Sequence, residues 1–465
     1  MTTDPRTQPE EGAAVAATAG PGPIRIEMVD LEGPLPDLRV EGDVTQVWVV
    51  GRRAGVPQLI VEVDLSEGPE AVAEQLRPMA ESVGALGLLP GGVDESALPR
   101  ISVVVPSIIA RTDELRTCLD GFGSLEYHDF EIILVDNRRE LPADDPLPGL
   151  LAGREGVRSV RALRPGISAA RNAGIAAATG EIVVFTDDDV HVDRRWLRAL
   201  GERFVRQPEL EAVTGLILPA ELETPAQIFF ERYYGGFSGE RTFAPLTLTA
   251  TRRPLGRSRV VVRDVTGHEV RTFAIYGVGA YGAGANMAFR RSTLQRLGGF
   301  DLALGTGTQA RGGEDLATLI DVLWDGGSIG YEPAAVVHHK HRREYDELVH
   351  QLRGNGLGFT AMLTSLVLHD PRHLLALGGQ LPLALRRMGS QTLARLSGRR
   401  AGAEEAAGGP DLYPKELVLR ELQGMPLGPS AYVRSRRSAT RWSAEHPEVA
   451  EAERSSALGA AGTRR

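Results

Sequence analysis

Short apolar segments alternate with helical patterns in the middle of the chain. Ile101–Val105, Glu131–Val135 and Ile182–Phe185 are runs of mainly apolar residues, which is typical of strands buried on both faces of a sheet. Leu115–Phe122 and Ser168–Ala178 lie between them and have helical character. This alternation predicts an α/β fold with a mostly parallel central sheet flanked by helices.

The regions on either side have other patterns. A small α+β module is predicted N-terminal to the sheet, from strand-like segments at Ile24–Met28, Val44–Val50 and Leu59–Val63 and a helical pattern at Glu70–Arg77 that Pro78 would end or kink. The expected organisation is a disordered tail (1–23), the small module (24–97), the α/β catalytic domain (98–345), C-terminal helices (346–400) and a polar, partly disordered tail (401–465).

The helical region after residue 345 leaves two interpretations open. Helices are expected at Tyr345–Leu352, at Gly358–Leu368 and from His373 to about Arg400. Residues 370–400 hold six arginines and one acid, Asp370. This segment is either a basic amphipathic helix in peripheral contact with a membrane or a helix packed on the catalytic domain.

Charge, cysteine content and the lengths of apolar runs bear on the protein's partners, disulfides and location. The formal net charge of -9 argues against a nucleic-acid partner. Cys118 is the one cysteine, so no internal disulfide can form, and it is interpreted as a small buried hydrophobe. The first residues do not resemble a signal peptide, and no run approaches the roughly 18 apolar residues of a membrane span. We therefore expect a cytoplasmic location, with peripheral contact on the inner face of the membrane as the alternative.

Three consecutive acids follow one of the buried strands. Asp187, Asp188 and Asp189 come directly after Val183–Phe185 and Thr186, and ligands of such sheets bind at the carboxyl ends of the strands. Carboxylates this close repel one another, and a divalent cation such as Mn²⁺ or Mg²⁺ would balance them. A solvated acidic turn is the alternative. Asp136 stands at the end of another strand.

Further candidate residues lie on both sides of the triplet. Glu314 and Asp315 follow two glycines and open a helical stretch, where acids also occur simply as helix caps. His339 and His341 alternate after a strand, so both can face one side and bind a metal, or they belong to a basic surface turn. Arg171 lies early in a helix after a glycine turn and could hold a diphosphate.

The order of these signals resembles a known family. From Ile101 to Arg343 the chain reads ISVVVPS, EIILVDN, GISAARNAGIAAATGEIVVFTDDD, NMAFRRSTLQRLGGFD, GGEDL and VVHHKHRR. These pieces, in this order, resemble the inverting family 2 glycosyltransferases with DXD and ED motifs. The resemblance covers about half of the chain. It implies the Rossmann-like GT-A fold for the α/β domain.

The resemblance also implies a role for each matching residue. Asp136, Arg171, Asp187 and Asp188 would bind the nucleotide-sugar donor, Asp189 would bind the metal, and His339 or His341 would complete the metal or diphosphate site. Asp315 would be the general base, with Glu314 orienting the acceptor or supporting the base. After the first strand the chain departs from the family's P-T-x-N-R by lacking the Asn. Pro106 and Arg111 remain expected donor contacts there.

The implied reaction moves a sugar from a nucleotide-diphosphate sugar to an acceptor hydroxyl by metal-assisted single displacement with a carboxylate base. UDP-sugars are the family's commonest donors, and the acceptor is not readable. A sugar nucleotidyltransferase is one alternative, although it should carry a Gly-rich phosphate loop where this chain reads PSIIAR. A non-catalytic carbohydrate-binding or scaffold subunit is the other, and it would not need the acids.

Two segments remain without an assigned role. The glycine-rich stretch 276–286 is either a connector or a loop close to the ligand, where Tyr276 and Tyr281 could stack on sugars. Residues Phe229–Thr272 are predicted to be a long polar insert with little pattern.

Overall fold

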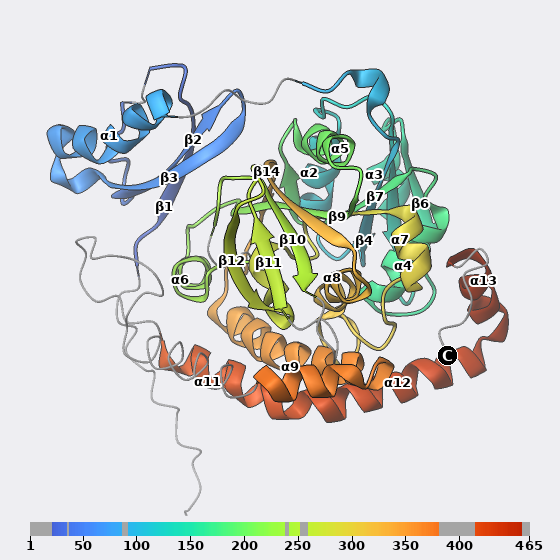
Figure 1. Cartoon of the computed structure of the whole chain (residues 1–465). Helices are drawn as coiled ribbons and strands as arrows, with labels where there is room; N and C mark the ends of the chain where they lie inside the picture. The colour runs from blue at the N-terminus through green and yellow to red at the C-terminus, as the bar shows by residue number, and fades with distance from the viewer. Residues whose placement is uncertain are drawn as a thin grey trace, which may run out of the picture.

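The computed structural model describes residues 21–34, 37–85, 92–237, 241–251, 259–380 and 414–457. Within this part of the chain, the strands form a three-stranded sheet near the N-terminus and an eleven-stranded sheet. Figure 1 shows the small sheet beside the large one, with the C-terminal helices on the opposite side of the molecule. The expected tail at residues 1–23 lies almost wholly outside the described residues.

The N-terminal module has the predicted strands and a longer helix. β1 (Ile24–Asp30) pairs in parallel with β2 (Gln46–Arg53), which pairs antiparallel with β3 (Val56–Asp64). α1 (Pro69–Ala85) packs on this sheet through Val72 and Leu76. Of the two predicted effects of Pro78, an end of the helix or a kink, the first is wrong, because α1 continues to Ala85. A proline removes one backbone hydrogen bond, and that loss alone does not end this helix.

An apolar contact attaches the module to the large domain. Ile24 and Trp48 are buried against Leu222 and Ile228, and the Ile24 amide donates to the Leu222 carbonyl at 2.8 Å. The guanidinium of Arg241 lies 5.7 Å from the centre of the Trp48 ring. The module therefore packs on the large domain through side chains from both partners.

The large sheet has a parallel half that agrees with the predicted α/β fold. The strands are β4 (Ile101–Ser107), β5 (Phe130–Asp136), β6 (Val157–Arg161), β7 (Ile182–Phe185), β8 (Val190–Val192), β9 (Leu210–Pro219), β10 (Leu246–Thr251), β11 (Arg259–Arg263), β12 (Glu269–Ala274), β13 (Met287–Arg290) and β14 (Ser328–His339). Their order is β12-β11-β10-β14-β9-β13-β7-β4-β5-β6, with β8 beside β14. β7, β4, β5 and β6 are mutually parallel.

The strand directions bring distant parts of the sequence to one edge. β13 is antiparallel to both of its neighbours, β7 and β9, so β9 has the same direction as β7. β14 is parallel to β9. The carboxyl ends of β4, β5, β7 and β14 therefore lie at the same edge of the sheet, which is where ligands bind in open α/β sheets.

The segment 229–272 is more regular than predicted. Instead of a patternless insert, it contributes β10, β11 and most of β12, which extend the sheet antiparallel from the edge of β14. Val260, Val261 and Val262 of β11 are buried while Arg259 is exposed. This buried run of three residues is short enough to be missed among polar residues.

Helices cover both faces of the large sheet. α2 (Thr112–Phe122), α3 (Leu147–Leu151) and α5 (Trp196–Arg206) pack on one face, and Cys118 is buried there as expected. The other face carries α4 (Ile167–Ala177), α7 (Arg291–Leu297) and α8 (Glu314–Asp325). α6 (Pro225–Phe229) begins with a capping box formed by Thr224 and Gln227.

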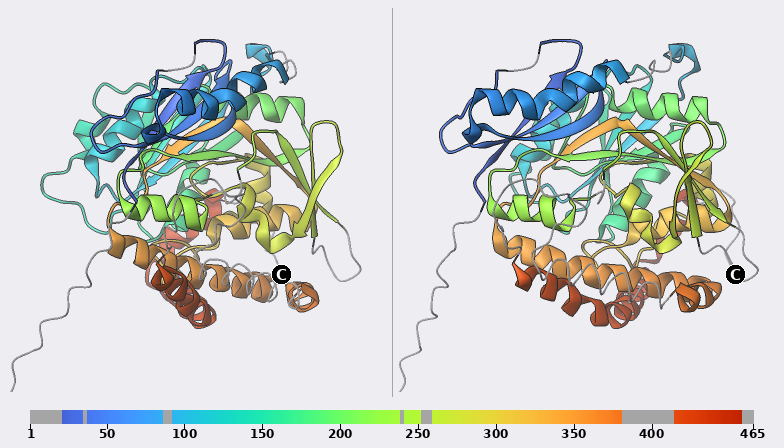
Figure 2. Two further views of the ribbon diagram at one scale, coloured as in Figure 1. Left: turned by 90° about the vertical axis from the view of Figure 1, so that its left-hand side faces the viewer. Right: turned by 60° about the vertical axis from the view of Figure 1, so that its left-hand side comes forward.

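The C-terminal helices form a further layer (Figure 2). α9 (Tyr345–His369) is a single helix where two were predicted. Its glycines do not break it, since at Gly356 the missing side chain is what lets another helix approach: a Cβ there would lie 2.1 Å from the Glu421 carbonyl oxygen. Of the basic segment 370–400, only residues 370–380 are described, so its membrane contact stays a prediction.

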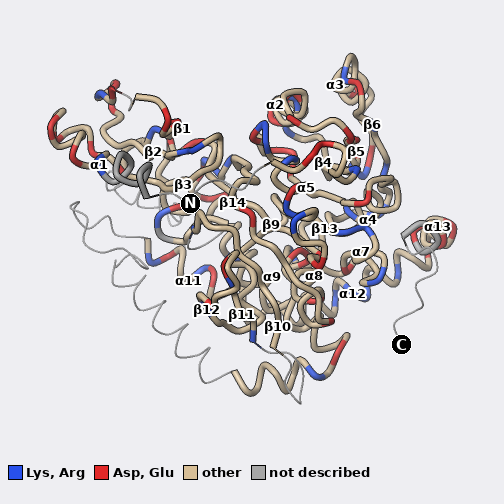
Figure 3. The backbone as a smooth tube through the Cα atoms, turned by 45° about the horizontal axis from the view of Figure 1, so that its top comes forward, with Lys and Arg blue, Asp and Glu red and all other residues tan. Residues whose placement is uncertain are grey.

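The prediction of a polar, partly disordered tail at 401–465 is incomplete. Residues 414–457 contain α11 (Lys415–Gly424), α12 (Gly428–Glu445) and α13 (Pro447–Ala457). Figure 3 shows basic residues along α12 and acidic residues on α13, and Arg164 of the large domain bonds to Glu453 while lying over the Trp442 ring. Among the residues that the structure describes, no helix combines the length and the apolar character needed to cross a bilayer.

Candidate active site

A cavity of about 2100 Å³ opens at the edge of the sheet where β4, β7 and β14 end. It runs from the end of β4, past the start of α8, to α9 and the described residues after it. The predicted site residues that line it are Pro106, Arg111, Asp187, Asp188, Asp189, Glu314, Asp315, His339 and His341. Most of the candidates named from sequence thus share one cavity.

The acid triplet begins immediately after β7 and its buried Thr186. Backbone contacts fix the turn at both ends, because the Thr186 amide donates to Val104 in β4 and the Lys340 amide donates to the Asp189 carbonyl. The three carboxylates consequently have different neighbours, although they are adjacent in sequence.

Asp188 is held against β4. The Ser107 hydroxyl donates to Asp188 Oδ2 at 2.5 Å. Burial raises the pKa of Asp188 to about 6, and the neighbouring Asp189 adds to the rise while Ser107 opposes it. Asp188 therefore faces β4, the first strand of the large domain.

Asp187 and Asp189 converge on His339. The His339 Nε2 lies 3.6 Å from Asp187 Oδ2 and 3.4 Å from Asp189 Oδ1. Burial opposes the charged imidazole, but Asp189 and Asp187 outweigh it and raise the pKa of His339. Arg111 donates to the other Asp189 oxygen, Oδ2, at 2.7 Å.

His341 does not join this group. Its Nε2 lies 2.6 Å from Glu231 Oε1, and Glu231 in turn accepts from Arg241. The prediction that His341 is a metal ligand is therefore wrong in this structure, because its Nε2 is committed to a buried carboxylate 110 residues away in sequence. Its ring contacts Phe230 and Phe237, and Phe237 also contacts His339.

Arg171 is a buried link and does not line the cavity. Its side chain donates to Glu314 Oε1 at 2.7 Å and lies 3.5 Å from Asp187 Oδ1. It is 1% exposed. Arg171 was expected to contact the donor directly. In the structure it instead connects the acid triplet to the start of α8 through ionic contacts.

Glu314 and Asp315 begin α8 in different surroundings. Gly313 has a φ of 85° and lies directly beneath the Gly358 carbonyl of α9, where a Cβ would be 2.8 Å from the oxygen. Burial raises the pKa of Glu314 to about 7, with Asp315 adding to the rise and Arg171 opposing it. Asp315 is half-buried, and its Oδ2 accepts from the Gly284 amide at 2.7 Å.

Asp136 is at the predicted strand end but is already paired. Arg138 donates to both of its carboxylate oxygens, at 2.9 and 2.8 Å. Burial opposes ionisation, but these hydrogen bonds outweigh it and lower the pKa of Asp136. Asp136 does not line the cavity, whereas Asn137 and Arg138 do. The predicted contact of Asp136 with the donor stays a prediction, and in this structure its carboxylate is bound to Arg138.

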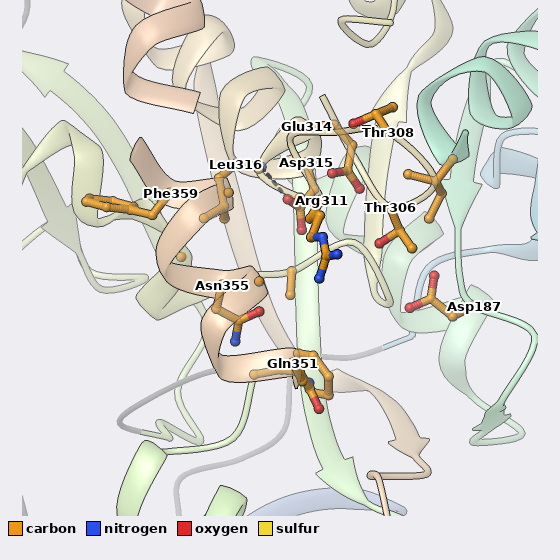
Figure 4. Close-up of a pocket in the computed structure, with 18 of the residues that line it drawn as sticks. Asp187, Thr306, Thr308, Arg311, Glu314, Asp315, Leu316, Gln351, Asn355 and Phe359 are labelled. Carbon is orange, nitrogen blue, oxygen red and sulfur yellow. Dashed lines mark hydrogen bonds between the residues drawn. The ribbon is translucent and has the colours of Figure 1, made fainter. Parts of the chain in front are cut away.

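Several lining residues were not identified from the sequence. Thr306, Thr308 and Arg311 come from the loop before α8, and Gln351 and Asn355 come from α9. Figure 4 shows Arg311 beside Asp315, with Asn355 on α9 facing the same space. Arg311 has a φ of 63°, which is unusual for a residue other than glycine. The sequence signal that could have identified Arg311 as a site residue is its position directly before Gly312, Gly313 and the two acids.

The glycine-rich stretch is ordered rather than a free connector. Residues Ile275–Tyr281 form two short 3-10 pieces with a kink at Gly277 between them. Tyr276 lines the cavity, but its hydroxyl lies 3.0 Å from His373 Nδ1. Tyr281 is buried in the core, stacked on Phe273, so it cannot stack on a sugar.

The residues around His339 suit a divalent cation. One ligand atom each from Asp187, Asp189 and His339 can be chosen so that all three lie within 4.8 Å of one another. Carboxylate oxygens suit Mg²⁺ and Mn²⁺, and imidazole is a common ligand of transition metals. The two carboxylates also supply the negative charge that a cation would balance, so the donor set fits.

A family comparison agrees with this geometry. Residues 102–298 match the family model described as glycosyl transferase family 2. This stretch of the chain is similar to glycosyl transferase family 2. The match spans β5, β7 and all but the first residue of β4. Glu314, Asp315 and His339 lie outside the matched range and join the site through the fold.

Curated relatives are similar over part of their length. The chain is 24% identical over 189 residues to the glucosyl-dolichyl phosphate glucuronosyltransferase of Haloferax volcanii, covering 40% of this chain and 51% of that protein. It is 26% identical over 287 residues to the pre-mycofactocin glycosyltransferase of Mycobacterium tuberculosis, covering 62% and 52%. The chain thus spans about half the length of these relatives.

Solved structures give similar but distant matches. The mannosyltransferase PcManGT from Pyrobaculum calidifontis, in complex with GDP-Man and Mn²⁺, has a TM-score of 0.42 and 18% identity, covering 77% of this chain and 94% of its own. GalNAc-T7 with UDP, GalNAc and Mn²⁺ has a TM-score of 0.39 and 16% identity, covering 58% and 51%.

Proposed function

We propose that the chain is a glycosyltransferase that moves a sugar from a nucleotide-diphosphate sugar to an acceptor hydroxyl by a single displacement. The observation that supports it most strongly is the shared cavity: the acid triplet after β7, His339 at the end of β14 and Asp315 at the start of α8 all line it. The match of residues 102–298 to the glycosyl transferase family 2 model and the names of the two curated relatives, both transferases of sugar groups, agree with this proposal.

The donor would bind at the ends of β4 and β5. Pro106 and Asn137 line that part of the cavity, and Arg139 brings positive charge to it, whereas Arg138 is paired with Asp136 and Asp145. Arg111, beside Asp188 and Asp189, supplies a further cation for phosphate oxygens. UDP-sugars are the first donors to test.

Asp187, Asp189 and His339 would hold the divalent cation. When bound, the cation would supply positive charge next to the diphosphate leaving group. The mixed carboxylate and imidazole set favours Mn²⁺ over Mg²⁺, because Mg²⁺ prefers oxygen ligands alone.

Asp315 would serve as the general base. Its Oδ2 accepts the Gly284 amide and its Oδ1 accepts the Leu316 amide, which fix the carboxylate at the cavity wall. From there it would accept the proton of an acceptor hydroxyl as the oxygen attacks the anomeric carbon. Attack from the side opposite the diphosphate would invert the configuration at that carbon.

Glu314 and Arg171 would position the reacting groups. Arg171 holds Glu314 directly and approaches Asp187, so one guanidinium connects the cation-binding side of the cavity to the base side. Because Glu314 is committed to this pair, Asp315 is the carboxylate left to face the acceptor.

Release of nucleoside diphosphate tests the proposal. Purified full-length chain is incubated with UDP-, dTDP- and GDP-sugars and Mn²⁺, with and without EDTA, and the products are separated by ion-exchange chromatography. We expect nucleoside diphosphate from at least one donor and its loss in EDTA. Release of pyrophosphate instead would indicate a nucleotidyltransferase, and no binding or turnover of any donor would contradict the proposal.

A further inference from the structure

The cavity is larger than a nucleotide sugar requires. Its volume of about 2100 Å³ exceeds the roughly 300–1,000 Å³ typical of small-molecule pockets. The extra space lies beyond Asp315, between α8, α9 and the described residues that follow α9. This is the side on which an acceptor would enter, since the donor side is at the ends of β4 and β5.

The cavity-facing residues of α9 change character along the helix. In its first half, Glu347, His350, Gln351 and Asn355 line the cavity, and in its second half Phe359 and Leu363 do so. Their spacing of three or four residues places them on one face of the helix. Figure 4 shows Asn355 and Gln351 on one side of Asp315, with Phe359 on the far side from Asp187. The part of the cavity wall formed by α9 thus changes from polar to apolar near Asp315, the proposed general base.

The apolar part of the wall has contributions from α8, α9 and the residues after α9, in addition to Val418, Leu422 and Met425 from α11 and the residue that follows it. Leu316 from α8, Phe359 and Leu363 from α9, and Leu374 and Leu377 from the residues after α9 line it. Leu316, Phe359, Leu363 and Leu377 pack on the core while staying partly accessible. Leu374 is 61% exposed. Its neighbour Leu375 is similarly exposed, at 54%, and does not line the cavity.

We propose that the acceptor is an amphipathic molecule whose hydroxyl-bearing polar end lies at Asp315 and whose apolar chain lies along the five side chains from α8, α9 and the residues after α9, which we name the apolar wall. The inference rests on the proposed function. Continuity identifies the occupant: Asp315 and Leu316 are adjacent on α8, so a molecule whose hydroxyl reaches Asp315 reaches the apolar wall with its next few atoms.

Burial of the acceptor's chain would supply most of the binding energy on this side. Each methylene moved from water to an apolar surface contributes roughly a four-fold gain in affinity. A glutamate at position 374 would introduce a charge into the wall, and the bound chain would desolvate it. The same change at position 375 would leave the wall intact, which gives a matched control on the same turn.

The experiment compares methyl, hexyl and octyl β-glucoside binding, all below micelle-forming concentrations, to the full-length chain by isothermal titration calorimetry. We expect octyl glucoside to bind at least 50-fold more tightly than methyl glucoside, following the per-methylene gain with incomplete burial. Leu374→Glu and Leu363→Glu should each reduce octyl glucoside affinity at least ten-fold, and Leu375→Glu should not change it. Circular dichroism checks that each variant is folded.

Three results would contradict the inference. One is equal affinity for methyl and octyl glucoside, and the second is unchanged octyl binding in both Leu374→Glu and Leu363→Glu. The third is an equal loss in Leu374→Glu and Leu375→Glu, which would indicate a general hydrophobic surface of the kind that binds lipid vesicles. Donor binding with Mn²⁺ is measured in the same samples, so a failure of the proposed function shows there, independently of the glucoside comparison.

Discussion

At the scale of single residues, buried ion pairs decide which acids are already bound to a protein side chain. Arg171 forms an ion pair with Glu314, and Arg138 forms one with Asp136. Glu231 is bound by both Arg241 and His341. Sequence pattern identified the acids after strands, because a strand end is a local feature. It could not identify which of them are paired, because the partner can be 143 residues away, as with Arg171 and Glu314.

Removal of Arg171 tests its role as a link. Arg171→Met would leave the buried Glu314 carboxylate without its partner, and breaking a buried pair in this way costs about 3–5 kcal/mol. We expect that loss in urea unfolding at pH 8.5, where Glu314 is charged. The double variant Arg171→Met/Glu314→Gln should recover part of it. Equal stability of the single variant and the native chain would show that the pair contributes nothing.

The raised pKa of Glu314 predicts a pH dependence of stability. Folding raises this pKa from an ordinary 4.5 to about 7, so the folded state binds the proton more tightly than the unfolded state. The stabilisation is complete below pH 4.5, declines as pH rises and is absent above pH 7. It amounts to at most about 3 kcal/mol. Glu314→Gln should remove this dependence between pH 5 and 7.5, and parallel stability curves for the two proteins would refute it.

Arg311 combines an unfavourable backbone with a position in the cavity. Its φ of 63° costs roughly 1–2 kcal/mol for a residue other than glycine. We therefore expect Arg311→Gly to keep or raise the free energy of unfolding while lowering kcat/KM, since the guanidinium beside Asp315 is lost. Arg311→Lys, which keeps both charge and backbone strain, is the control. A Gly variant that is both less stable and fully active would contradict this account.

At the scale of elements, local sequence patterns were sufficient to predict the buried strands. They were insufficient to predict elements that depend on packing between distant parts of the chain. The buried runs at β4, β5 and β7 were found within a residue or two, because short segments that are apolar throughout are typical of strands covered on both faces. The continuity of α9 was missed, since its glycines look like helix breaks until the contact with α11 is known. β10 to β12 were missed for a similar reason, as they depend on pairing with β14.

Substitution by alanine is expected to have opposite effects on stability at two glycines of α9. At Gly356 a Cβ would lie 2.1 Å from the Glu421 carbonyl oxygen, whereas at Gly354 it would meet nothing within 4 Å. Gly354→Ala should therefore stabilise the protein by about 1 kcal/mol through helix propensity. Gly356→Ala should destabilise it, because α11 must move away. Thermal unfolding of both variants checks this, and equal shifts in Tm would mean that α11 does not pack as closely as described.

At the scale of the whole molecule, the path of the chain assembles the site. Two antiparallel steps, from β7 to β13 and from β13 to β9, restore the direction of the sheet, and β14 then ends beside the acid triplet. The motifs suggested this convergence, but the sequence could not show that the C-terminal helices close the far side of the cavity. Their polar composition looked like that of a tail, and their packing against α9, α4 and Arg164 is visible only in the structure.

The central claim is that the carboxylates at the end of β7 and at the start of α8 act on one substrate pair from one cavity. Turnover and donor binding of Asp315→Asn, measured side by side with a nucleotide sugar and Mn²⁺, test it most directly. We predict that the variant binds the donor as the native chain does while turnover falls by about 10²–10⁴-fold. Native turnover in Asp315→Asn would contradict the account.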